Sequence, residues 1–248
     1  GIRASELITI TAGAGLGKSQ FVRELLFYVL KNTSDNLGLM FMEESVKRTA
    51  ESFMSLEANK PLHLPHIKEE VSEEEYKEYF DSTLGTERVF LYDHFGSNEI
   101  DTILSRVRYF ANVLNCKYIC LDHVSIIVSN QNVQDERRAL DEIMTKLRTL
   151  VQELNIVLFL VSHLRRPTGS GHEEGAVTSL SHLRGSASIG QLSDIVIGLE
   201  RNGQHEDEYE RHTTTVRVIK NRFSGLTGPA CRLKYSLITG RMSEIDED

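Results

Sequence analysis

Tryptophan is absent from the sequence, and cysteine and proline are scarce, with three and four residues among 248. The three cysteines are odd in number and lack the spacing of metal ligands, which argues against a disulfide scaffold and against a zinc centre. We expect reduced thiols in a cytoplasmic protein. The chain also lacks an apolar run of the roughly 20 residues that a membrane-spanning helix needs, so we expect no membrane partner.

Positive charge is in deficit, because 28 lysines and arginines face 36 aspartates and glutamates, for a formal net charge of −8. This balance argues against a protein that coats nucleic acid with its whole surface, although it allows a local basic site. The length suits one large α/β domain over 1–248 with a substantial core. Because the chain begins at Gly1 rather than Met, we expect a fragment that lacks an N-terminal domain or linker.

A glycine-rich segment near the start has the spacing of a phosphate-binding loop. An apolar alternation over 7–11 leads into it, and a helical pattern begins at Lys18. Glycines let successive backbone N–H groups point at a phosphate, and the N-terminus of the helix favours the same anion. Lys18 would reach the β- and γ-phosphates, and the Ser19 hydroxyl would bind Mg²⁺. The motif starts with Ala12 where glycine is usual, a minor departure. The residues expected to contact nucleotide are Gly13, Ala14, Gly15, Leu16, Gly17, Lys18, Ser19 and Gln20.

Strand and helix patterns alternate along the chain, which favours an α/β fold with a mostly parallel sheet and helices on both faces. The expected strands are 7–11, 37–42, 89–92, 118–122, 156–161 and 195–199. The expected helices are 18–31, 45–56, 100–114 and 136–154, with a short helix after 186. The segment 57–87 is predicted to be a surface insertion with one solvated helix, and 206–211 a polar turn. Finally, 213–221 alternates as an antiparallel strand, a hairpin covers 228–242, and the acidic tail 244–248 is expected to fray.

Three strand ends carry polar groups suited to nucleotide hydrolysis. Asp122 closes an apolar strand and would bind Mg²⁺, unless it is a plain strand-end residue. Glu43 follows another strand and would deprotonate the attacking water, with Glu44 as the alternative base. His163 ends a third strand and would sense the γ-phosphate, unless it is structural. Ligands bind at the carboxyl ends of parallel strands, so we expect these groups to converge. His123 is assigned a structural role, because its neighbour already binds the metal.

Basic residues gather late in the chain. Lys220 and Arg222 are two residues apart on a predicted strand and therefore face the same side, and Arg201 follows the preceding strand. Directed at a phosphate held by a neighbouring subunit, such cations would stabilise transition-state charge in trans. The alternative is a solvated basic edge strand that guards against aggregation. Spacing alone leaves both interpretations open.

The segment 164–182 is rich in glycine, serine, threonine and charge. Arg165 and Arg166 lie at its start, and Arg184 follows it in a Leu-Arg-Gly-Ser sequence. Basic side chains with glycine and serine N–H donors suit contacts with a phosphate backbone. The lack of interleaved aromatic residues argues against base stacking. A surface loop with scattered charges is the alternative, and the triplet that starts at His172 lacks a metal-ligand spacing.

Together these motifs closely resemble the helicase domains of short-tailed-phage bifunctional primase–helicases, within the DnaB-like hexameric helicases of the RecA fold. The resemblance covers essentially the whole chain. Its marks are Ala12–Ser19, Met42–Ser45, Leu121–Ser125, Ser162–Leu164, Leu183–Ser186, Gln191–Asp194, Leu199–Asn202 and Lys220–Phe223, followed by Gly225, Thr227 and Gly228.

The resemblance implies a RecA-like P-loop NTPase that forms a ring homohexamer with nucleotide at each subunit interface. It implies a replicative DNA helicase that uses Mg²⁺ with ATP or dTTP, translocates 5′ to 3′ on single-stranded DNA and unwinds duplex DNA. It also implies a primase domain in the full-length chain and, for a phage-encoded protein, action in the cytoplasm of the bacterial host. The acidic tail suggests a basic partner, for which a DNA polymerase is the candidate.

At the residue level, the resemblance makes Arg222 the arginine finger, with Lys220 and Arg201 also contacting the neighbour's nucleotide. Gln191 would link the γ-phosphate state to the DNA loops, and Tyr235 would pack on the base. The candidate catalytic residues are Glu43, Lys18, His163 and Arg222. The candidate DNA-binding residues are Arg165, Arg166, Arg184, Gly185 and Ser186.

Two departures from the family pattern concern the base and the DNA. The basic residue expected on the other face of the base falls near Pro61, and the lysines expected in the first DNA loop are replaced by 168–171. Two other functions remain open. One is a RecA-like strand-exchange or clock-type ATPase that shares the fold, and the other is a ring scaffold that uses nucleotide for assembly without unwinding.

Overall fold

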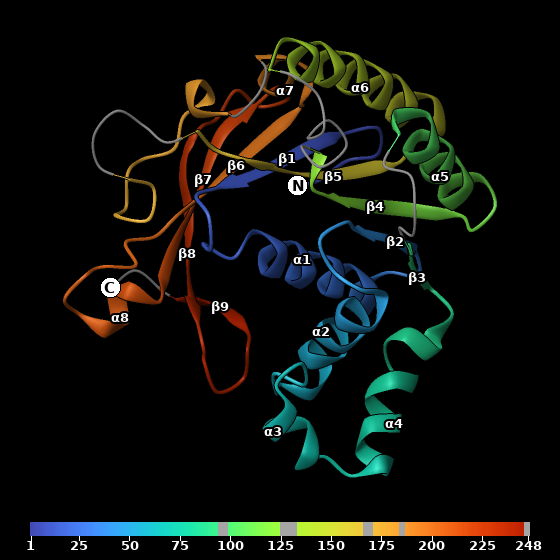
Figure 1. The fold of residues 1–248 in the computed structure, drawn as a ribbon, viewed down its shortest axis with the longest axis vertical. Coiled ribbons are helices and arrows are strands. Elements are labelled where there is room, and N and C mark those ends of the chain that lie inside the picture. Colours follow the sequence, from blue (N-terminus) through green and yellow to red (C-terminus); the bar gives the residue numbers. More distant parts are fainter. Residues whose placement is uncertain (94–98, 125–132, 166–170, 184–186, 246–248) are drawn as a thin grey trace.

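The computed structural model describes residues 1–93, 99–124, 133–165, 171–183 and 187–245 (Figure 1). They form a nine-stranded sheet in the order β3-β2-β4-β5-β1-β6-β7-β8-β9. The strands are Leu7–Ala12 (β1), Asn36–Phe41 (β2), Val89–Leu91 (β3), Cys116–Asp122 (β4), Val157–His163 (β5), Ile195–Glu200 (β6), Thr213–Asn221 (β7), Gly228–Tyr235 (β8) and Met242–Ile245 (β9).

The sheet has a parallel part and an antiparallel part. Strands β3, β2, β4, β5, β1 and β6 pair in parallel, whereas β7, β8 and β9 add to the β6 side in antiparallel pairs. The predicted fold class, a mostly parallel sheet with antiparallel strands at the C-terminal end, is confirmed. The carboxyl ends of all the parallel strands lie in one row. This row is one edge of the sheet, the row of the strands' amino ends is the other, and the candidate site lies at the carboxyl edge.

Helices cover both faces of the sheet, with α1 and α2 on one side and α5, α6 and α7 on the other (Figure 1). The helices are Lys18–Asn32 (α1), Val46–Ala58 (α2), Pro65–Glu69 (α3), Glu73–Asp81 (α4), Ile100–Asn112 (α5), Val133–Leu154 (α6), Ala187–Leu192 (α7) and Glu208–Arg211 (α8). Among the helices in the described part of the chain, none combines the length and hydrophobicity that crossing a bilayer requires.

Two apolar clusters, one on each face, hold the helices to the sheet, and β5 contributes to both. Val157, Phe159 and Val161 belong to the cluster that α1 completes, whereas Leu158 and Leu160 belong to the cluster that α6 completes. Successive side chains of a strand point to opposite faces, so a central strand covered on both faces is apolar at every position. Each such side chain contributes about 1.5–3 kcal/mol when it is fully buried.

The segment 57–87 differs from the prediction of one solvated helix. It contains two helices, α3 and α4, and a 3₁₀ turn at Leu84–Thr86. A capping box between Ser72 and Glu75 starts α4, because each satisfies the other's backbone N–H. The side chain of Leu62 is fully buried. The segment is therefore packed onto the domain, which the run of acidic residues did not indicate.

Two further boundaries differ from the sequence prediction. Residues Glu244 and Ile245, assigned to a frayed tail, belong to β9 and pair with β8. The polar segment 206–211, predicted as a turn, contains the short helix α8. Residues 246–248 lie outside the described residues.

Candidate nucleotide-binding site

The connection between β1 and α1 is the predicted strand–loop–helix arrangement. Gly15 and Gly17 have φ angles of 69° and 85°, a left-handed conformation that glycine adopts without a Cβ penalty. Lys18 is the first residue of α1, and its side chain folds back over the loop. Its Nζ donates hydrogen bonds to the carbonyl oxygens of Ala12 at 3.3 Å and Gly13 at 3.0 Å. The ammonium group therefore lies inside the curve of the loop, where phosphates bind in such motifs.

The side chains of Ser19 and Asp122 meet at the start of α1. Ser19 Oγ donates a short hydrogen bond to Asp122 Oδ2. Asp122 is 5% exposed, and burial raises the pKa of its carboxyl group, although the bond from Ser19 opposes this. Burial likewise lowers the pKa of Lys18, while Asp122 and Glu43 oppose the change. A hydroxyl and a carboxylate are the hard oxygen donors that Mg²⁺ prefers, and the cation would offset the buried negative charge, so these residues fit the predicted metal.

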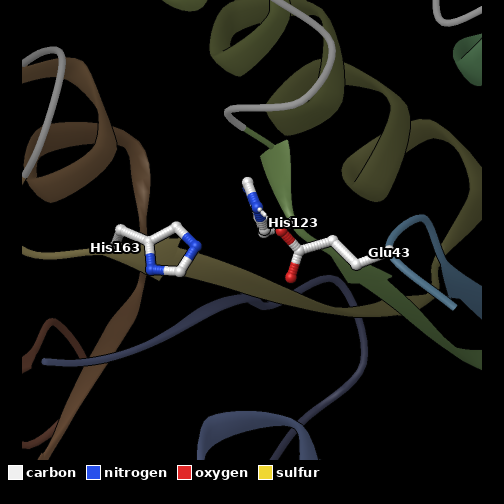
Figure 2. Close-up of side chains that lie close together, drawn as sticks. All are labelled: Glu43, His123 and His163. Carbon is white, nitrogen blue, oxygen red and sulfur yellow. Dashed lines mark hydrogen bonds and ion pairs between the residues drawn. The ribbon is translucent and has the colours of Figure 1, made fainter. Parts of the chain in front are cut away.

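Glu43, His123 and His163 lie at or just beyond the carboxyl ends of three consecutive strands, β2, β4 and β5 (Figure 2). His123 Nε2 and Glu43 Oε1 are 2.8 Å apart. The rings of His123 and His163 meet edge to face, with 4.3 Å between their centroids. One potential ligand atom from each residue lies within 4.8 Å of the other two. The sequence placed Glu43 and His163 at one edge, but it did not indicate that His123 joins them.

The alternative base, Glu44, has different surroundings. Glu44 Oε1 lies 2.5 Å from a guanidinium nitrogen of Arg23, and its other oxygen accepts a hydrogen bond from Thr49 at 3.3 Å. Arg23 is 6% exposed, so Glu44 offsets a buried positive charge. The side chain of Glu43 is 58% exposed at the open edge of the sheet. These surroundings favour Glu43 over Glu44 as the group that contacts water.

A cavity of about 280 Å³ lies beside the P-loop, between α1, α2 and the end of β8. Tyr235 and Pro61 both line it, at the two positions that the resemblance relates to the base. Arg48 and His63 line the same cavity, and sequence reasoning did not single them out. Burial, together with the positive charge of Arg48, lowers the pKa of His63. The cavity thus offers an aromatic ring, a proline ring and polar groups of the kind that surround a nucleobase.

Arg201 lies against the P-loop of its own chain. It follows β6, which is parallel and adjacent to β1, so both strands end at the same edge. The Arg201 guanidinium donates to the carbonyl oxygen of Gly15 at 3.0 Å and lines the 280 Å³ cavity. Gln20 also lines this cavity, and its amide donates to the carbonyl oxygen of Gly240 at 2.8 Å. The resemblance implied that Arg201 contacts the neighbour's nucleotide, whereas in the structure Arg201 lines the cavity beside the P-loop of its own chain.

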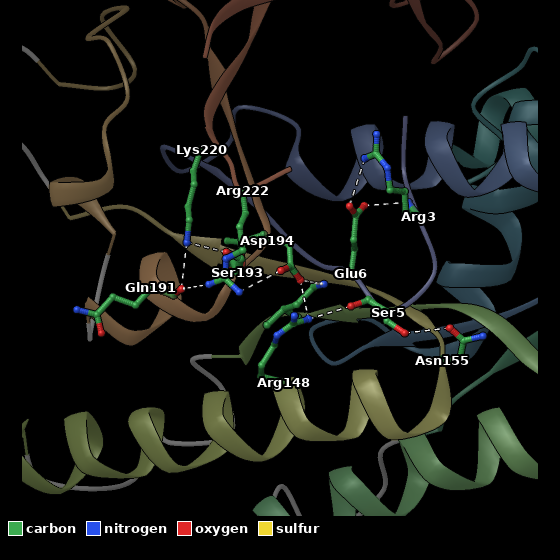
Figure 3. A network of polar contacts seen from close by, with 12 residues as sticks. Arg3, Ser5, Glu6, Arg148, Asn155, Gln191, Ser193, Asp194, Lys220 and Arg222 are labelled. Atoms are coloured by element: carbon green, nitrogen blue, oxygen red, sulfur yellow. Dashed lines mark hydrogen bonds and ion pairs between the residues drawn. The ribbon is translucent and has the colours of Figure 1, made fainter. Parts of the chain in front are cut away.

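Arg222 lies at the other edge of the sheet, where β1 begins (Figure 3). Its backbone N–H donates to Asp194 O at 2.8 Å, and the Asp194 N–H donates to Leu7 O at 2.8 Å. The guanidinium is 3.3 Å from Asp194 Oδ1 and donates to Gln191 O at 2.7 Å. The candidate arginine finger therefore lies at the opposite end of the strands from Lys18 of the same chain.

Lys220 lies beside Arg222 and closes the end of α7. Its Nζ donates to the carbonyl oxygens of Gly190 at 2.7 Å, Gln191 at 3.0 Å and Ser193 at 2.8 Å. A cation at these carbonyls complements the C-terminal end of a helix. Burial and the charge of Arg222 lower the pKa of Lys220. The carbonyl oxygen of Gln191 accepts hydrogen bonds from both Lys220 and Arg222. These three residues form the cationic edge of the sheet, which lies away from the P-loop of the same chain.

The model of the DnaB-like helicase C-terminal domain family matches residues 1–242. The chain belongs to this family. This DnaB-like domain is 37% identical over 243 residues to the DNA helicase/primase of Enterobacteria phage T3, which covers 97% of the chain and 42% of that relative. It is 21% identical over 231 residues to the replicative DNA helicase DnaB of Geobacillus stearothermophilus, covering 92% of the chain and 50% of that relative. The chain thus spans about half the length of the curated relatives it matches.

Solved structures share the fold of the DnaB-like domain. A DnaB-like replicative helicase has a TM-score of 0.80 at 18% identity, covering 98% of this chain and 58% of that chain. A KaiC-like protein from Pyrococcus horikoshii has a TM-score of 0.66 at 14% identity, covering 99% and 92%. At these identities the likeness shows the fold alone, which is the RecA-like arrangement predicted from the sequence.

The candidate DNA-binding residues of the DnaB-like domain follow β5 or precede α7. Arg165 is exposed, and its backbone N–H donates to His182 O at 2.7 Å. Leu164 and Leu183 pair as an antiparallel bridge, which brings the two ends of the intervening segment together. The remaining candidates lie outside the described residues: Arg166, Arg184, Gly185 and Ser186.

The segment 171–178 packs over the P-loop. His172 is 3% exposed, and a Cβ atom added to Gly13 would lie 2.7 Å from His172 Cβ. Glu173 O accepts a hydrogen bond from the Gly203 N–H at 2.9 Å, which fastens the segment beyond β6. A cavity of about 630 Å³ is lined by the P-loop residues Gly13 and Ala14, by the end of β5, and by His172 and Glu173. The triplet 172–174, to which the sequence analysis assigned no role, therefore joins the candidate DNA-binding region to the P-loop through His172.

Proposed function

We propose that this chain is the NTP-driven motor domain of a replicative DNA helicase, which forms a ring homohexamer, translocates 5′ to 3′ on single-stranded DNA and unwinds duplex DNA. The observation that carries the proposal is the separation of Lys18 and Arg222 to opposite edges of one sheet. A head-to-tail interface between two copies would bring these two edges together, and such an interface repeats around a closed ring.

One subunit would supply the binding half of each site. Lys18 and the N–H groups of the P-loop would hold the phosphates, and Ser19 and Asp122 would hold Mg²⁺, which neutralises phosphate charge when bound. Glu43 would take a proton from the attacking water. Arg222 of the neighbouring subunit would stabilise the charge that develops in the transition state, with Lys220 beside it.

Hydrolysis would reach DNA through the segment that follows β5. His163 would donate a hydrogen bond to the γ-phosphate, and Arg165 and Arg166 follow it two and three residues later in the chain. Loss of the γ-phosphate would free His163, and the two arginines would then shift along the DNA strand. Gln191, at the cationic edge, would carry the nucleotide state of the neighbouring site toward Arg184, Gly185 and Ser186. This scheme uses both edges of the sheet for one step of translocation.

The base cavity and the partners complete the proposal. Tyr235 would pack on the base of ATP or dTTP, while Arg201 would contact the nucleotide of its own chain. We infer a primase domain elsewhere in the longer protein, since the phage T3 relative is named a helicase/primase. We infer a DNA polymerase as the partner of the acidic C-terminal segment 244–248, and action in the cytoplasm of a bacterial host.

A forked duplex with a 5′ single-stranded tail tests the proposal. With Mg²⁺ and ATP or dTTP, the chain should displace the annealed strand, hydrolyse nucleotide faster when single-stranded DNA is present, and have the mass of a hexamer. Lys18→Ala should abolish hydrolysis, and normal turnover in that variant would contradict the site. Hydrolysis indifferent to DNA, without displacement, would point to a scaffold, and filaments that exchange strands would point to a recombinase.

A further inference from the structure

The order of the strands places His123 between two groups of the proposed site. Glu43 follows β2 and His163 ends β5, and these two strands are not neighbours, because β4 lies between them. His123 follows β4, and it contacts both side chains (Figure 2). The backbone fixes this arrangement, since the Met42 N–H donates to Asp122 O at 2.6 Å and thus joins the chain just before Glu43 to the chain just before His123.

The contact between His123 and Glu43 joins a buried group to an exposed one. The side chain of His123 is 8% exposed, whereas that of Glu43 is 58% exposed. An exposed glutamate samples several rotamers, and a hydrogen bond to a fixed ring selects one of them. In the part of the chain that the structure describes, His123 is the residue that hydrogen-bonds this carboxylate. The direction of the carboxylate therefore depends on the ring of His123.

The rest of the ring packs on His163 and makes no hydrogen bond to a described residue. Its edge-to-face contact with His163 holds the plane of the ring, at an angle of 80° between the two rings. Its Nδ1 atom is buried and has no hydrogen-bond partner among the described residues. Most buried polar atoms in proteins are hydrogen-bonded, because an unpaired one costs about 1–3 kcal/mol. Among the described residues, the polar contact of this ring is therefore the one that its Nε2 atom makes with Glu43.

We propose that His123 is a positioning residue, which holds the Glu43 carboxylate in the direction of the attacking water and ties it to His163. The inference rests on the proposed function, because it takes Glu43 as the base and His163 as the phosphate sensor. Two histidines and a carboxylate also form a set that binds transition metals. Here, however, Glu43 Oε1 and His123 Nε2 satisfy each other directly, and a metal would need both atoms.

Substitutions of similar shape separate the hydrogen bond from the packing. His123→Gln keeps an amide group near the position of Nε2, whereas His123→Phe keeps a ring against His163 without any hydrogen bond. Each variant is measured for melting temperature, for KM and for kcat of nucleotide hydrolysis with Mg²⁺ and single-stranded DNA. Glu43→Gln is measured alone and combined with His123→Phe, so that the two effects can be compared for additivity.

We expect His123→Phe to lower kcat by about 10- to 100-fold, because the misplaced base loses its near-attack geometry, while KM changes by less than about 2-fold. His123→Gln should recover most of kcat, and His123→Phe should cause no further loss in the Glu43→Gln background. Wild-type kcat in His123→Phe, equal losses in the Gln and Phe variants, or additive losses with Glu43→Gln would each overturn the inference. If Glu43→Gln itself hydrolyses normally, the proposed base is wrong, which is a different failure.

Discussion

Arg222 and Lys18 lie at opposite edges of the same nine-stranded sheet. Arg222 is joined through Asp194 to Leu7, where β1 begins, whereas Lys18 follows the loop that leaves β1 after Ala12. Six residues of extended chain separate the two edges by about 17 Å. An arginine side chain does not cross that distance through a packed core, so Arg222 serves the nucleotide of another copy or none at all.

Replacement of Arg222 tests whether this residue is needed for hydrolysis but not for nucleotide binding. Arg222→Ala should lower hydrolysis by about 10³-fold, because transition-state charge loses a cation, while nucleotide binding persists. The fold should survive, since Asp194 keeps the bond from Leu7 N–H at 2.9 Å and the ion pair with Arg148 at 2.6 Å. Nucleotide affinity, hydrolysis rate and melting temperature are measured together. Arg232→Ala, which breaks an ion pair between β8 and Glu210, is the matched control and should hydrolyse normally.

Asp122 should show opposite effects on stability and on activity. Folding raises the pKa of this carboxyl group by burial. The contribution of the group to stability is therefore fully present below the ordinary aspartate pKa and is lost as pH rises through the raised native value. Without Mg²⁺, Asp122→Asn should therefore be more stable than the parent at pH 7. The gain should shrink on acidification toward pH ~4, while Mg²⁺-dependent hydrolysis is lost at every pH.

Denaturant titrations at pH 7 and pH 4, with and without Mg²⁺, measure the stability effect of Asp122→Asn. The control is Asp101→Asn, which changes an aspartate whose side chain is 87% exposed and should leave both stability and hydrolysis almost unchanged. A loss of stability in Asp122→Asn at pH 7 without the metal would contradict the electrostatic account of this site.

Much of the site was predictable because it depends on local sequence. A strand, a glycine turn and a helix are contiguous, so the positions of Lys18 and Ser19 follow from the motif itself. Asp122 and Glu43 could be placed at the same edge because parallel strands all end there. The edge was predictable without the strand order, since every crossover returns the chain to the same side.

The rest depends on contacts between segments that are far apart in the sequence. The cis position of Arg201 requires β6 to lie beside β1, and the role proposed for His123 requires β4 to lie between β2 and β5. The order of the strands in the sheet cannot be predicted from the spacing of residues in the sequence. Arg48 and His63 line the 280 Å³ cavity because α2 and the chain after it lie beside the P-loop, which composition does not reveal. His172 was missed for the same reason.

The aromatic ring of Tyr235 should contribute to binding rather than to chemistry. Stacking of a base on an aromatic side chain contributes about 1–3 kcal/mol, so Tyr235→Ala should raise KM by about 10-fold with kcat little changed. Tyr235→Phe should keep a KM close to that of the parent. Steady-state kinetics with ATP and with dTTP measure both variants, and Tyr28→Ala, an exposed residue of α1, serves as control. Equal effects of the Ala and Phe variants would show that the ring does not stack on the base.

The contact of Gly13 with His172 allows a test by compensation. Gly13 lies outside the left-handed region, so alanine meets no backbone strain there. Its Cβ would nevertheless lie 2.7 Å from His172 Cβ, and one of the two segments must move. Gly13→Ala should therefore raise the KM for nucleotide about 10-fold. Adding His172→Gly removes the obstructing atom and should restore part of the loss. A double variant no better than Gly13→Ala would show that the two segments do not press on each other.

The most direct test of the interface site mixes two inactive variants. Arg222→Ala keeps Glu43, and Glu43→Gln keeps Arg222, so each lacks a different half of the site. The two variants are mixed in equal amounts. If Arg222 acts in trans, about a quarter of the sites in randomly mixed rings have both halves intact. Hydrolysis should then rise to about a quarter of the parent rate. If Arg222 acts within its own chain, every site lacks one group. In that case the mixture would stay as inactive as either variant alone, which would contradict the account.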